Sequence, residues 1–382
     1  MSECASAVAS PAREPLPVKW YRSPVPREQM MALLARSDAR GFAQTLPHLT
    51  LIAATGTAAY LAIMQPTAWF GAWSPWVLLA ALPLLMLHGM LCSFAINAVH
   101  ELGHGTVFRT KWLNRFFEAV FAFIGWIHHD HFTVSHTRHH RYTLHYPDDQ
   151  EETLPKKFDT RGIWRHGGLL EWRFPLLWVQ AMRNQLRIAQ GLAGFDGPWN
   201  AVLFPADKPA LRSPIRRWAV ALFAGHLGIV VVAIAYGWWA LPLVVSLTPY
   251  YGGWLQQLMN NTQHIGMMKD VGDARLCCRS FTTHPVLQYF YWHMNFHIEH
   301  HMFAAVPCYR LNDLHRTIVF DLPPTPHGIR VTWNDINRIQ ALQLANPLYE
   351  ERPALPPAAE PQATSATAAP APLTSDLAVA LA

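Results

Sequence analysis

Cysteine pairs of the CxxC kind are absent from this 382-residue sequence. This absence excludes a disulfide scaffold, an iron–sulfur ferredoxin module and a zinc ribbon as the basis of the fold. The chain holds five cysteines in all: Cys4, Cys92, Cys277, Cys278 and Cys308.

Charged residues are also scarce. They make up 14% of the chain, against about 25% in ordinary soluble domains, whereas hydrophobic residues make up 51%. No Asp, Glu, Lys or Arg occurs between Arg40 and Glu101, or between Arg217 and Lys269. The net charge is +5, but the sequence has neither the runs of basic residues nor the motifs that bind in a nucleic-acid groove, which nucleic-acid binding requires. The composition therefore indicates a membrane protein with no nucleic-acid partner.

Each uncharged block is long enough for two helical crossings of about 20 residues. Proline and glycine mark a turn near 65–74 in the first block, and a second turn falls near 237–241. The sequence thus predicts an all-α integral membrane fold with four transmembrane helices in two hairpins. The excess of Lys and Arg outside the blocks predicts a bacterial-type inner membrane protein with both termini and the active site in the cytoplasm. The predicted spans are 45–64, 76–98, 218–236 and 240–260.

The other segments are predicted to lie outside or along the membrane. Residues 1–44 form a cytosolic N-terminal segment with a candidate amphipathic helix, and 331–351 form a cytosolic extension. Residues 352–382 are rich in Pro and Ala and lack aromatics, which is typical of a disordered tail. Segments 116–127 and 164–190 are too short or too charged to cross, and we expect them to lie at the membrane surface.

Histidine is the unusual residue, with 21 copies and three tight clusters. In HxxxH and HxxHH spacings on a helix, the side chains share one face and reach one metal centre. Imidazole is a ligand well suited to iron, and eight imidazoles are too many for a single ion, so two metal ions are predicted. The eight histidines are His100, His104, His136, His139, His140, His297, His300 and His301. We expect ordinary polar roles for His128, His129, His131, His145, His284 and His293.

The context of the clusters resembles the three histidine boxes of the membrane fatty acid desaturase and hydroxylase family. The segments are HELGHGTVF at 100–108, HTRHHRYTLH at 136–145 and HIEHHMFAAVP at 297–307. The resemblance covers residues 45–330. It implies a four-helix membrane bundle whose cytosolic helical cap holds a non-haem di-iron site. It also implies O2 as co-substrate and two electrons from an external donor.

Two residues near the end of the fourth predicted span extend this ligand set. Asn260 and His264 are four apart, so on a helix they share a face. The resemblance implies that His264 binds one iron and that Asn260 approaches the other through water.

Carboxylates near the boxes are candidates to orient the ligands, because a carboxylate that accepts a hydrogen bond from the far imidazole nitrogen fixes the ring. For Glu151 and Glu152, a solvated acidic loop is at least as good an interpretation. The candidates are Asp148, Asp149, Glu101, Asp130 and Glu299.

The boxes leave three outcomes open on a fatty acyl chain: desaturation, hydroxylation, or oxidative decarboxylation of a free acid to a terminal alkene. Desaturation is the commonest outcome for this box pattern and is our prediction, whereas carotenoid oxidation is a weaker alternative. No catalytic residue beyond the metal centre is predicted. The acyl chain is expected as a free acid, a thioester or a lipid ester. The chain has neither an HPGG haem motif nor a four-cysteine electron carrier. A separate ferredoxin or rubredoxin with its reductase is therefore expected.

A rival interpretation comes from the HELGH segment, which also matches the HExxH motif of zinc proteases with Glu101 as general base. An intramembrane protease of this kind needs an acidic third ligand from a distant helix. The nearest motif, at 311–314, lacks the required glycine. This interpretation also leaves both HxxHH clusters unexplained. A metal transporter is a third possible class of protein, but it needs a relay of ionisable groups within the spans. His48, His88 and His226 are too few to form one.

Overall fold

The computed structural model describes residues 17–66, 71, 74, 76–160 and 173–357, and the regular structure in this part of the chain is helical. Most of the tail predicted to be disordered, at 358–382, lies outside the described residues. So do the residues at 164–172, which open one of the predicted surface segments.

Three helical stretches are long and apolar enough to cross a membrane, at 38–64, 76–103 and 209–236. They coincide with three of the four predicted spans. The first is α2 (Asp38–Met64), which begins before residue 45 because the Ser37 side chain caps its first turn by accepting the Arg40 N–H. The second comprises α4 (Trp76–Ser93) and α5 (Ala95–Gly103), and the third is η1 (Pro209–Arg212) followed by α10 (Ser213–Tyr236).

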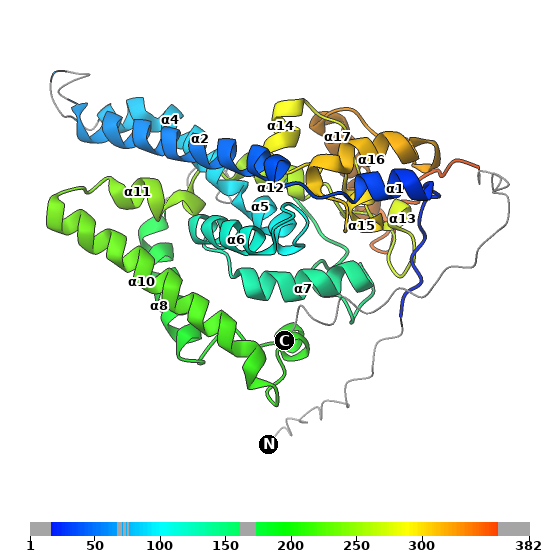
Figure 1. Ribbon diagram of the computed structural model, residues 1–382, viewed down its shortest axis with the longest axis horizontal. Helices are drawn as coiled ribbons and strands as arrows, with labels where there is room; N and C mark the ends of the chain where they lie inside the picture. The colour runs from blue at the N-terminus through cyan, green and yellow to red at the C-terminus, as the bar shows by residue number, and fades with distance from the viewer. Residues whose placement is uncertain (1–16, 67–70, 72–73, 75, 161–172, 358–382) are drawn as a thin grey trace.

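The prediction of a continuous fourth helix at 240–260 is wrong. This segment is broken into α11 (Leu241–Val245), η2 (Thr248–Tyr250) and α12 (Trp254–Asn260). Pro249 has no amide N–H to continue a helix, and Gly252 adopts a left-handed conformation with φ of 78°. The broken path still returns the chain from the far end of α10 towards the centre of the molecule (Figure 1). It contacts α2, α4 and α10, and irregular backbone at membrane depth is tolerated where protein surrounds it.

Buried histidines tie the apolar helices together. His48 Nε2 lies 2.9 Å from the Leu91 carbonyl oxygen, and His88 Nε2 lies 2.8 Å from the Val244 carbonyl oxygen. His226 Nδ1 lies 2.9 Å from Ser246 Oγ. Because each of these buried imidazoles has a polar partner on another segment, they join the spans to one another and to the broken return.

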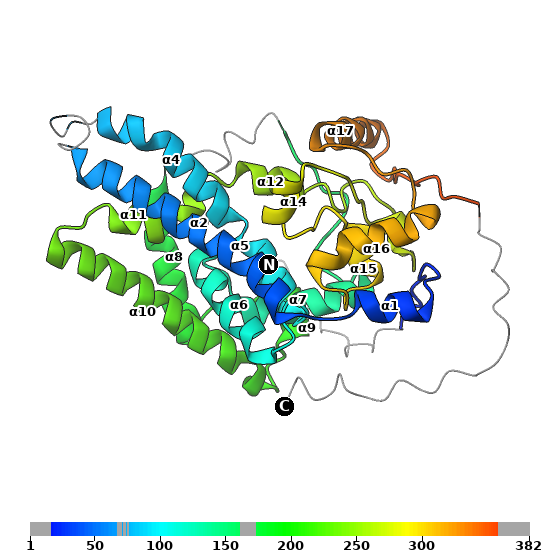
Figure 2. The same ribbon diagram turned by 45° about the horizontal axis from the view of Figure 1, so that its top comes forward.

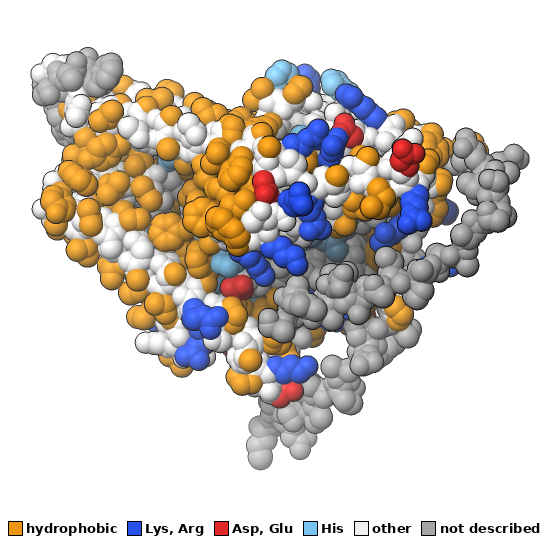
Figure 3. Space-filling model, viewed as in Figure 1, with side chains coloured by type: hydrophobic (Ala, Val, Ile, Leu, Met, Phe, Trp, Pro, Cys, Tyr) orange, Lys and Arg blue, Asp and Glu red, His pale blue; other side chains and the backbone are white. Residues whose placement is uncertain are grey.

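A second set of helices forms a cap at the end of α5 (Figure 2). We define the cap as α1, α7 and α12–α17. Figure 3 shows hydrophobic side chains over the spans and most Lys, Arg, Asp and Glu side chains towards the cap. The apolar surface of the spans is clear at Ile234, which is 77% exposed. The cap helices not yet given are α1 (Arg27–Leu33), α7 (His129–Tyr142), α13 (Ala274–Cys277), α14 (Pro285–Phe290), α15 (His297–Met302), α16 (Leu311–Ile318) and α17 (Ile329–Ala345).

The segments predicted to lie at the membrane surface form helices beside the spans. α6 (Lys111–Gly125) packs against α5, and α8 (Phe174–Ala189) packs against α10. The remaining described elements are α9 (Pro198–Leu203), η3 (Cys308–Arg310) and η4 (Val319–Asp321).

The N-terminal segment is fastened to the cap by a buried polar cluster. Ser23 Oγ donates to Asp321 over 2.5 Å, and Arg275 Nη1 pairs with the same carboxylate at 2.6 Å. The Tyr21 N–H donates to the Gly272 carbonyl over 2.8 Å. These contacts close the cap around the ends of α5, α7 and α15, which carry the three histidine boxes.

Candidate metal centre

Five imidazoles from the three boxes meet at one point. The Nε2 atoms of His100, His136, His140 and His300 form a closed ring with edges of 2.9, 2.9, 3.0 and 2.8 Å. The ligand nitrogen of His104 lies within 4.8 Å of all four, and its Nε2 is buried without a hydrogen-bond partner. We call these five residues the first group.

The first group has the dimensions of a metal site. A square with edges of about 2.9 Å has its centre about 2.1 Å from each corner, which is the usual distance from an imidazole nitrogen to a first-row metal ion. Burial and the neighbouring imidazoles hold the pKa values of His136, His140 and His300 well below 6.5. Burial lowers the pKa of His104 to about 4. Neutral imidazoles with free lone pairs are the form that binds metal.

A second group lies beside the first. The ligand atoms of His264, Cys278, His297 and His301 lie within 4.8 Å of one another. His264 Nε2 and His297 Nε2 are 2.9 Å apart, and His301 Nε2 is buried without a partner. The ring centroid of His139 lies 5.1 Å from that of His264 and 5.0 Å from that of His301. The structure therefore places eight of the nine sequence-predicted histidines in two adjacent groups, with the ring of His139 beside the second.

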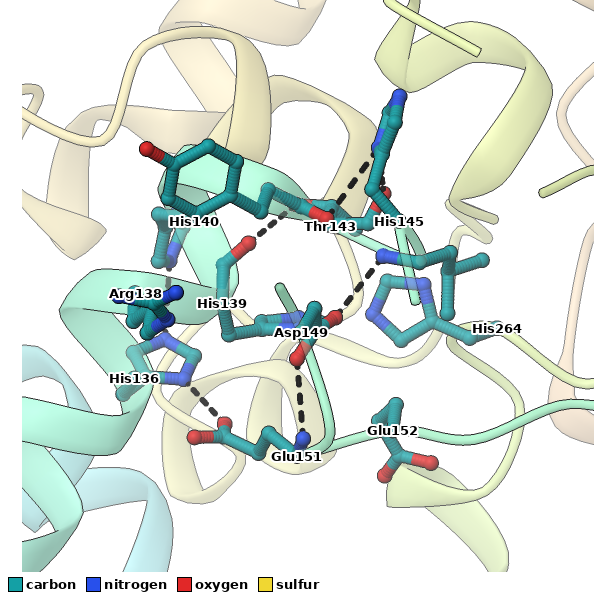
Figure 4. A network of polar contacts seen from close by, with 12 residues as sticks. His136, Arg138, His139, His140, Thr143, His145, Asp149, Glu151, Glu152 and His264 are labelled. Atoms are coloured by element: carbon teal, nitrogen blue, oxygen red, sulfur yellow. Dashed lines mark hydrogen bonds and ion pairs between the residues drawn. The ribbon is translucent and has the colours of Figure 1, made fainter. Parts of the chain in front are cut away.

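An acidic loop after α7 orients one imidazole towards each group (Figure 4). Glu151 Oε1 accepts a hydrogen bond from His136 Nδ1 over 2.6 Å, and Asp149 Oδ2 accepts one from His139 Nδ1 over 2.8 Å. The Glu151 backbone N–H donates to Asp149 Oδ1 over 2.9 Å, which links the two residues through the backbone of Glu151. With the Nδ1 proton held in this way, the Nε2 lone pair of each ring faces the site.

The two carboxyls differ in their electrostatics. Burial raises the pKa of Asp149, but hydrogen bonds from His139 and from the Leu144 and Glu151 amides outweigh it, so the pKa lies below its usual value. Burial raises the pKa of Glu151 despite its hydrogen bond from Ser135. Asp149 is thus held as a carboxylate beside His139.

Glu101 lies beside the first group, with its Oε1 at 3.2 Å from His300 Nδ1 and 3.9 Å from His100 Nε2. This carboxyl is 1% exposed and lies near two rings of the first group, but neither of its oxygens makes a hydrogen bond in the described structure, so its orienting role stays a prediction.

The structure places three other candidate carboxylates away from the ligands. Glu299 accepts a hydrogen bond from Ser280 Oγ over 2.5 Å and also pairs with His315. Its side chain leaves α15 on the face opposite to the one on which the box histidines make their contacts. Asp148 pairs with Arg138 at 3.3 Å, and Asp130 lies 3.8 Å from His129. In the described structure, each of the three therefore supports a neighbour rather than a ligand imidazole.

The prediction that Asn260 and His264 share one face of a helix is also wrong. α12 ends at Asn260, so the two residues do not share a helix face. His264 nevertheless reaches the second group, and its Nδ1 lies 2.9 Å from the Cys277 carbonyl oxygen. Asn260 is half-buried at the end of α12, and its approach to an iron through water stays a prediction.

Several neighbouring histidines have other partners, in keeping with the ordinary roles predicted for them. His128 Nε2 lies 2.8 Å from Gln185 Oε1, and His131 Nε2 lies 2.7 Å from Asn200 Oδ1. His145 Nδ1 lies 2.9 Å from the Thr143 carbonyl oxygen. None of them enters either group in the part of the chain described.

Comparison with known families agrees with this arrangement. The family model described as "Fatty acid desaturase" matches residues 73–333, which is more than half of the chain and includes all three boxes. This chain belongs to the fatty acid desaturase family. No curated protein matches it. For a desaturase-family protein, the two adjacent histidine groups are compatible with metal binding.

Two residues of the site are absent from the ligand and orienting sets predicted by the sequence. Glu151 follows the second box by eleven residues, and only its nearness to the box distinguishes it from a solvated acid. Cys278 has no motif around it, because its neighbours in the second group come from positions 264, 297 and 301.

Proposed function

We propose that this desaturase-family protein is an O2-dependent membrane oxidase that holds two iron ions and introduces a double bond into a fatty acyl chain. The observation that carries the proposal is the pair of adjacent histidine groups, with the first matching metal–imidazole dimensions. The first group would hold one ion, and His139, His264, His297 and His301 would hold the other. When bound, the two irons would activate O2, the oxidant that removes hydrogen from an unactivated C–H bond, which no side chain can do.

The residues around the site position these ligands and keep water out. Asp149 and Glu151 hold the Nδ1 protons of His139 and His136, so these rings cannot rotate away from the centre. Glu101 lies beside His300, with 3.2 Å between its Oε1 and the His300 Nδ1. All three carboxyls are partly or fully buried, so the site gains orientation without opening to bulk water.

A cavity among the spans suits an acyl chain. Its volume is about 440 Å³, within the range of about 300–1,000 Å³ for ligand pockets, and its lining is almost entirely apolar. The lining includes Ile52, Gly56, Cys92, Ile124 and Val244. Cys92 precedes His100 by eight residues, which is about 12 Å of helix. We therefore place the acyl chain in this cavity, with its reacting carbons towards the histidine groups.

The imidazole on the cavity wall already has hydrogen-bond partners. His88 lines the cavity, but its Nε2 lies 2.8 Å from the Val244 carbonyl oxygen and its Nδ1 lies 3.0 Å from Thr55 Oγ1. The wall therefore presents no free imidazole nitrogen, and it favours a hydrocarbon chain over a polar substrate.

We predict that Ala53→Phe shortens the acyl chain that the enzyme accepts, because Ala53 lines the cavity. A phenyl ring displaces about three methylenes, worth about 2 kcal/mol or roughly 30-fold in affinity for the longest chain. Competition between acyl chains of graded length measures the effect. Ala54→Phe is the matched control, since Ala54 is exposed on the same helix and is absent from the lining. An identical chain-length profile for both variants would contradict this placement.

Product analysis tests the proposed reaction. The protein, expressed in a host of known lipid content, should yield fatty acids two mass units lighter than the substrate. A product heavier by one oxygen would instead indicate hydroxylation, and a terminal alkene one carbon shorter would indicate decarboxylation. A purified protein with iron, O2 and a reduced ferredoxin or rubredoxin that leaves every acyl chain unchanged would sink the proposal.

The proposed location is an inner membrane of bacterial type, with the cap and both termini in the cytoplasm, where a soluble electron donor is available. Reporter fusions after Ser74 and at the C-terminus should report opposite sides, because α2 and α4 cross in opposite directions and the broken return restores the original side. The same side for both fusions would show that the two-hairpin topology is wrong, because either α2 does not cross or the broken return does not restore the original side.

The zinc-protease alternative has no support here. The chain belongs to the desaturase family, and both histidines of HELGH lie in a group with three further imidazoles. A single zinc with an acidic third ligand leaves those imidazoles without a role.

A further inference from the structure

The second group contains a thiol among its imidazoles. Cys278 Sγ lies within 4.8 Å of the ligand nitrogens of His264, His297 and His301. The Cys278 side chain is fully buried, and the Nε2 of His301 in the same group has no hydrogen-bond partner. The first group has no comparable sulfur, so the two centres differ in their donor atoms.

The backbone fixes this thiol between the two segments that carry the second-group histidines. The Cys277 carbonyl accepts from His264, and the next residue but one, Arg279, donates its amide to the Gln263 carbonyl over 2.8 Å. The Arg279 guanidinium also binds the Thr262 and Ile265 carbonyls, at 2.7 and 3.1 Å. Contacts on both sides of Cys278 therefore hold it against the loop of His264.

A third contact holds the same segment against α15. Ser280 Oγ accepts the Ile298 N–H over 2.9 Å and donates to Glu299 Oε2 over 2.5 Å. Because α15 carries His297 and His301, this contact sets the position of Cys278 relative to both rings. Rotation of the Cys278 side chain is the only local freedom left to the sulfur.

We propose that Cys278 binds the second metal ion as a thiolate, beside His139, His264, His297 and His301. This inference rests on the proposed metal centre and adds a ligand of a different chemical class to it. The thiol loses one proton when the metal–sulfur bond forms. Cys278 also lines a cavity of about 210 Å³ with Arg279, Asp335 and Glu351.

The thiolate makes the two centres electronically unequal. Imidazole is neutral, whereas a thiolate carries a full negative charge and donates electron density to the ion that it binds. The second metal ion should therefore be easier to oxidise than the first, which has five imidazoles only. A softer ligand also raises the preference of this centre for ions that bind sulfur.

Cobalt spectroscopy tests this inference without reliance on turnover. The purified full chain is freed of metal and reloaded with Co²⁺, and cobalt uptake is measured alongside the near-ultraviolet spectrum, where thiolate-to-cobalt charge transfer absorbs and imidazole does not. We expect two cobalt ions per chain and a charge-transfer band in the wild type. Cys278→Ser should lose the band.

Cys277→Ser is the matched control. Cys277 is equally buried and its Sγ lies 3.8 Å from that of Cys278, but it does not belong to the group. This variant should keep the band. Full cobalt uptake with no band, or a band that survives in Cys278→Ser, would overturn the thiolate ligand alone. A wild type that takes up no cobalt would overturn the metal centre and the inference together.

X-ray absorption on the unsubstituted protein gives a second measurement if Cys278→Ser does not fold. The cobalt edge should show sulfur at about 2.3 Å, averaging half a sulfur per metal ion. A shell of nitrogen and oxygen alone would contradict the proposal.

Discussion

Replacing one ligand histidine by alanine should abolish turnover and remove metal from its own centre. In the first group, His140→Ala breaks two edges of the Nε2 ring, at 2.9 and 3.0 Å. In the second, His297→Ala removes the nitrogen that lies 2.9 Å from His264 Nε2. Each variant should keep about one iron per chain instead of two, as measured by elemental analysis of the purified protein. Both should still insert in the membrane.

Two histidines near the boxes serve as controls for this prediction. His129 lies 3.7 Å from Glu118 and 4.5 Å, between ring centroids, from Trp218, and His145 contacts backbone carbonyls. His129→Ala and His145→Ala should therefore keep substantial iron. If either variant lost as much iron as His140→Ala, the division between ligands and neighbours would be wrong.

The second large effect is expected from the acidic loop. Glu151→Gln replaces the carboxyl that accepts the His136 Nδ1 proton by a neutral amide, which is a weaker acceptor, and Asp149→Asn does the same for His139. Loss of such a partner typically lowers metal affinity or activity by about 10- to 100-fold. Because the two carboxyls serve different groups, Glu151→Gln should weaken the first centre and Asp149→Asn the second. Competition with a chelator, followed by counting the iron that remains, measures each effect.

Glu152→Gln is the control for the loop, since Glu152 pairs with Lys156 at 2.9 Å and contacts neither group. It should hold iron as the wild type does. Equal iron loss in Glu151→Gln and Glu152→Gln would mean that the loop acts through its overall charge rather than through the hydrogen bond to His136.

The three histidine boxes could be predicted from sequence because their spacing is local. Residues three and four apart on a helix share a face whatever the rest of the fold does. The boxes at 136–140 and 297–301 lie on α7 and α15, and their side chains converge as that rule requires. Which imidazole belongs to which centre depends on contacts between distant segments, and spacing alone does not contain that information.

The fourth predicted span shows that hydropathy alone does not predict whether an apolar segment forms a continuous helix. The block at 240–260 is uncharged, but hydropathy counts neither the missing amide of Pro249 nor the left-handed backbone of Gly252. Those features break the helix. Contacts with surrounding protein provide for the backbone N–H and C=O groups that lipid could not hydrogen-bond. The prediction of His264 relies on a helical spacing that the structure does not have. His264 joins the second group from the turn that follows α12.

Glu151 and Cys278 could not be predicted for a related reason. A solvated acid and an orienting acid look identical in sequence, and only the fold of the loop brings Glu151 to 2.6 Å from His136. Cys278 reaches its group because Arg279 and Ser280 bind segments that lie far away in the chain.

Metal analysis of the purified wild-type protein tests the central claim most directly. Our account predicts about two iron ions per chain and no stoichiometric zinc, because eight histidines form two adjacent groups and the His139 ring lies beside the second. One zinc ion per chain, with no iron after expression in iron-replete medium, would contradict it.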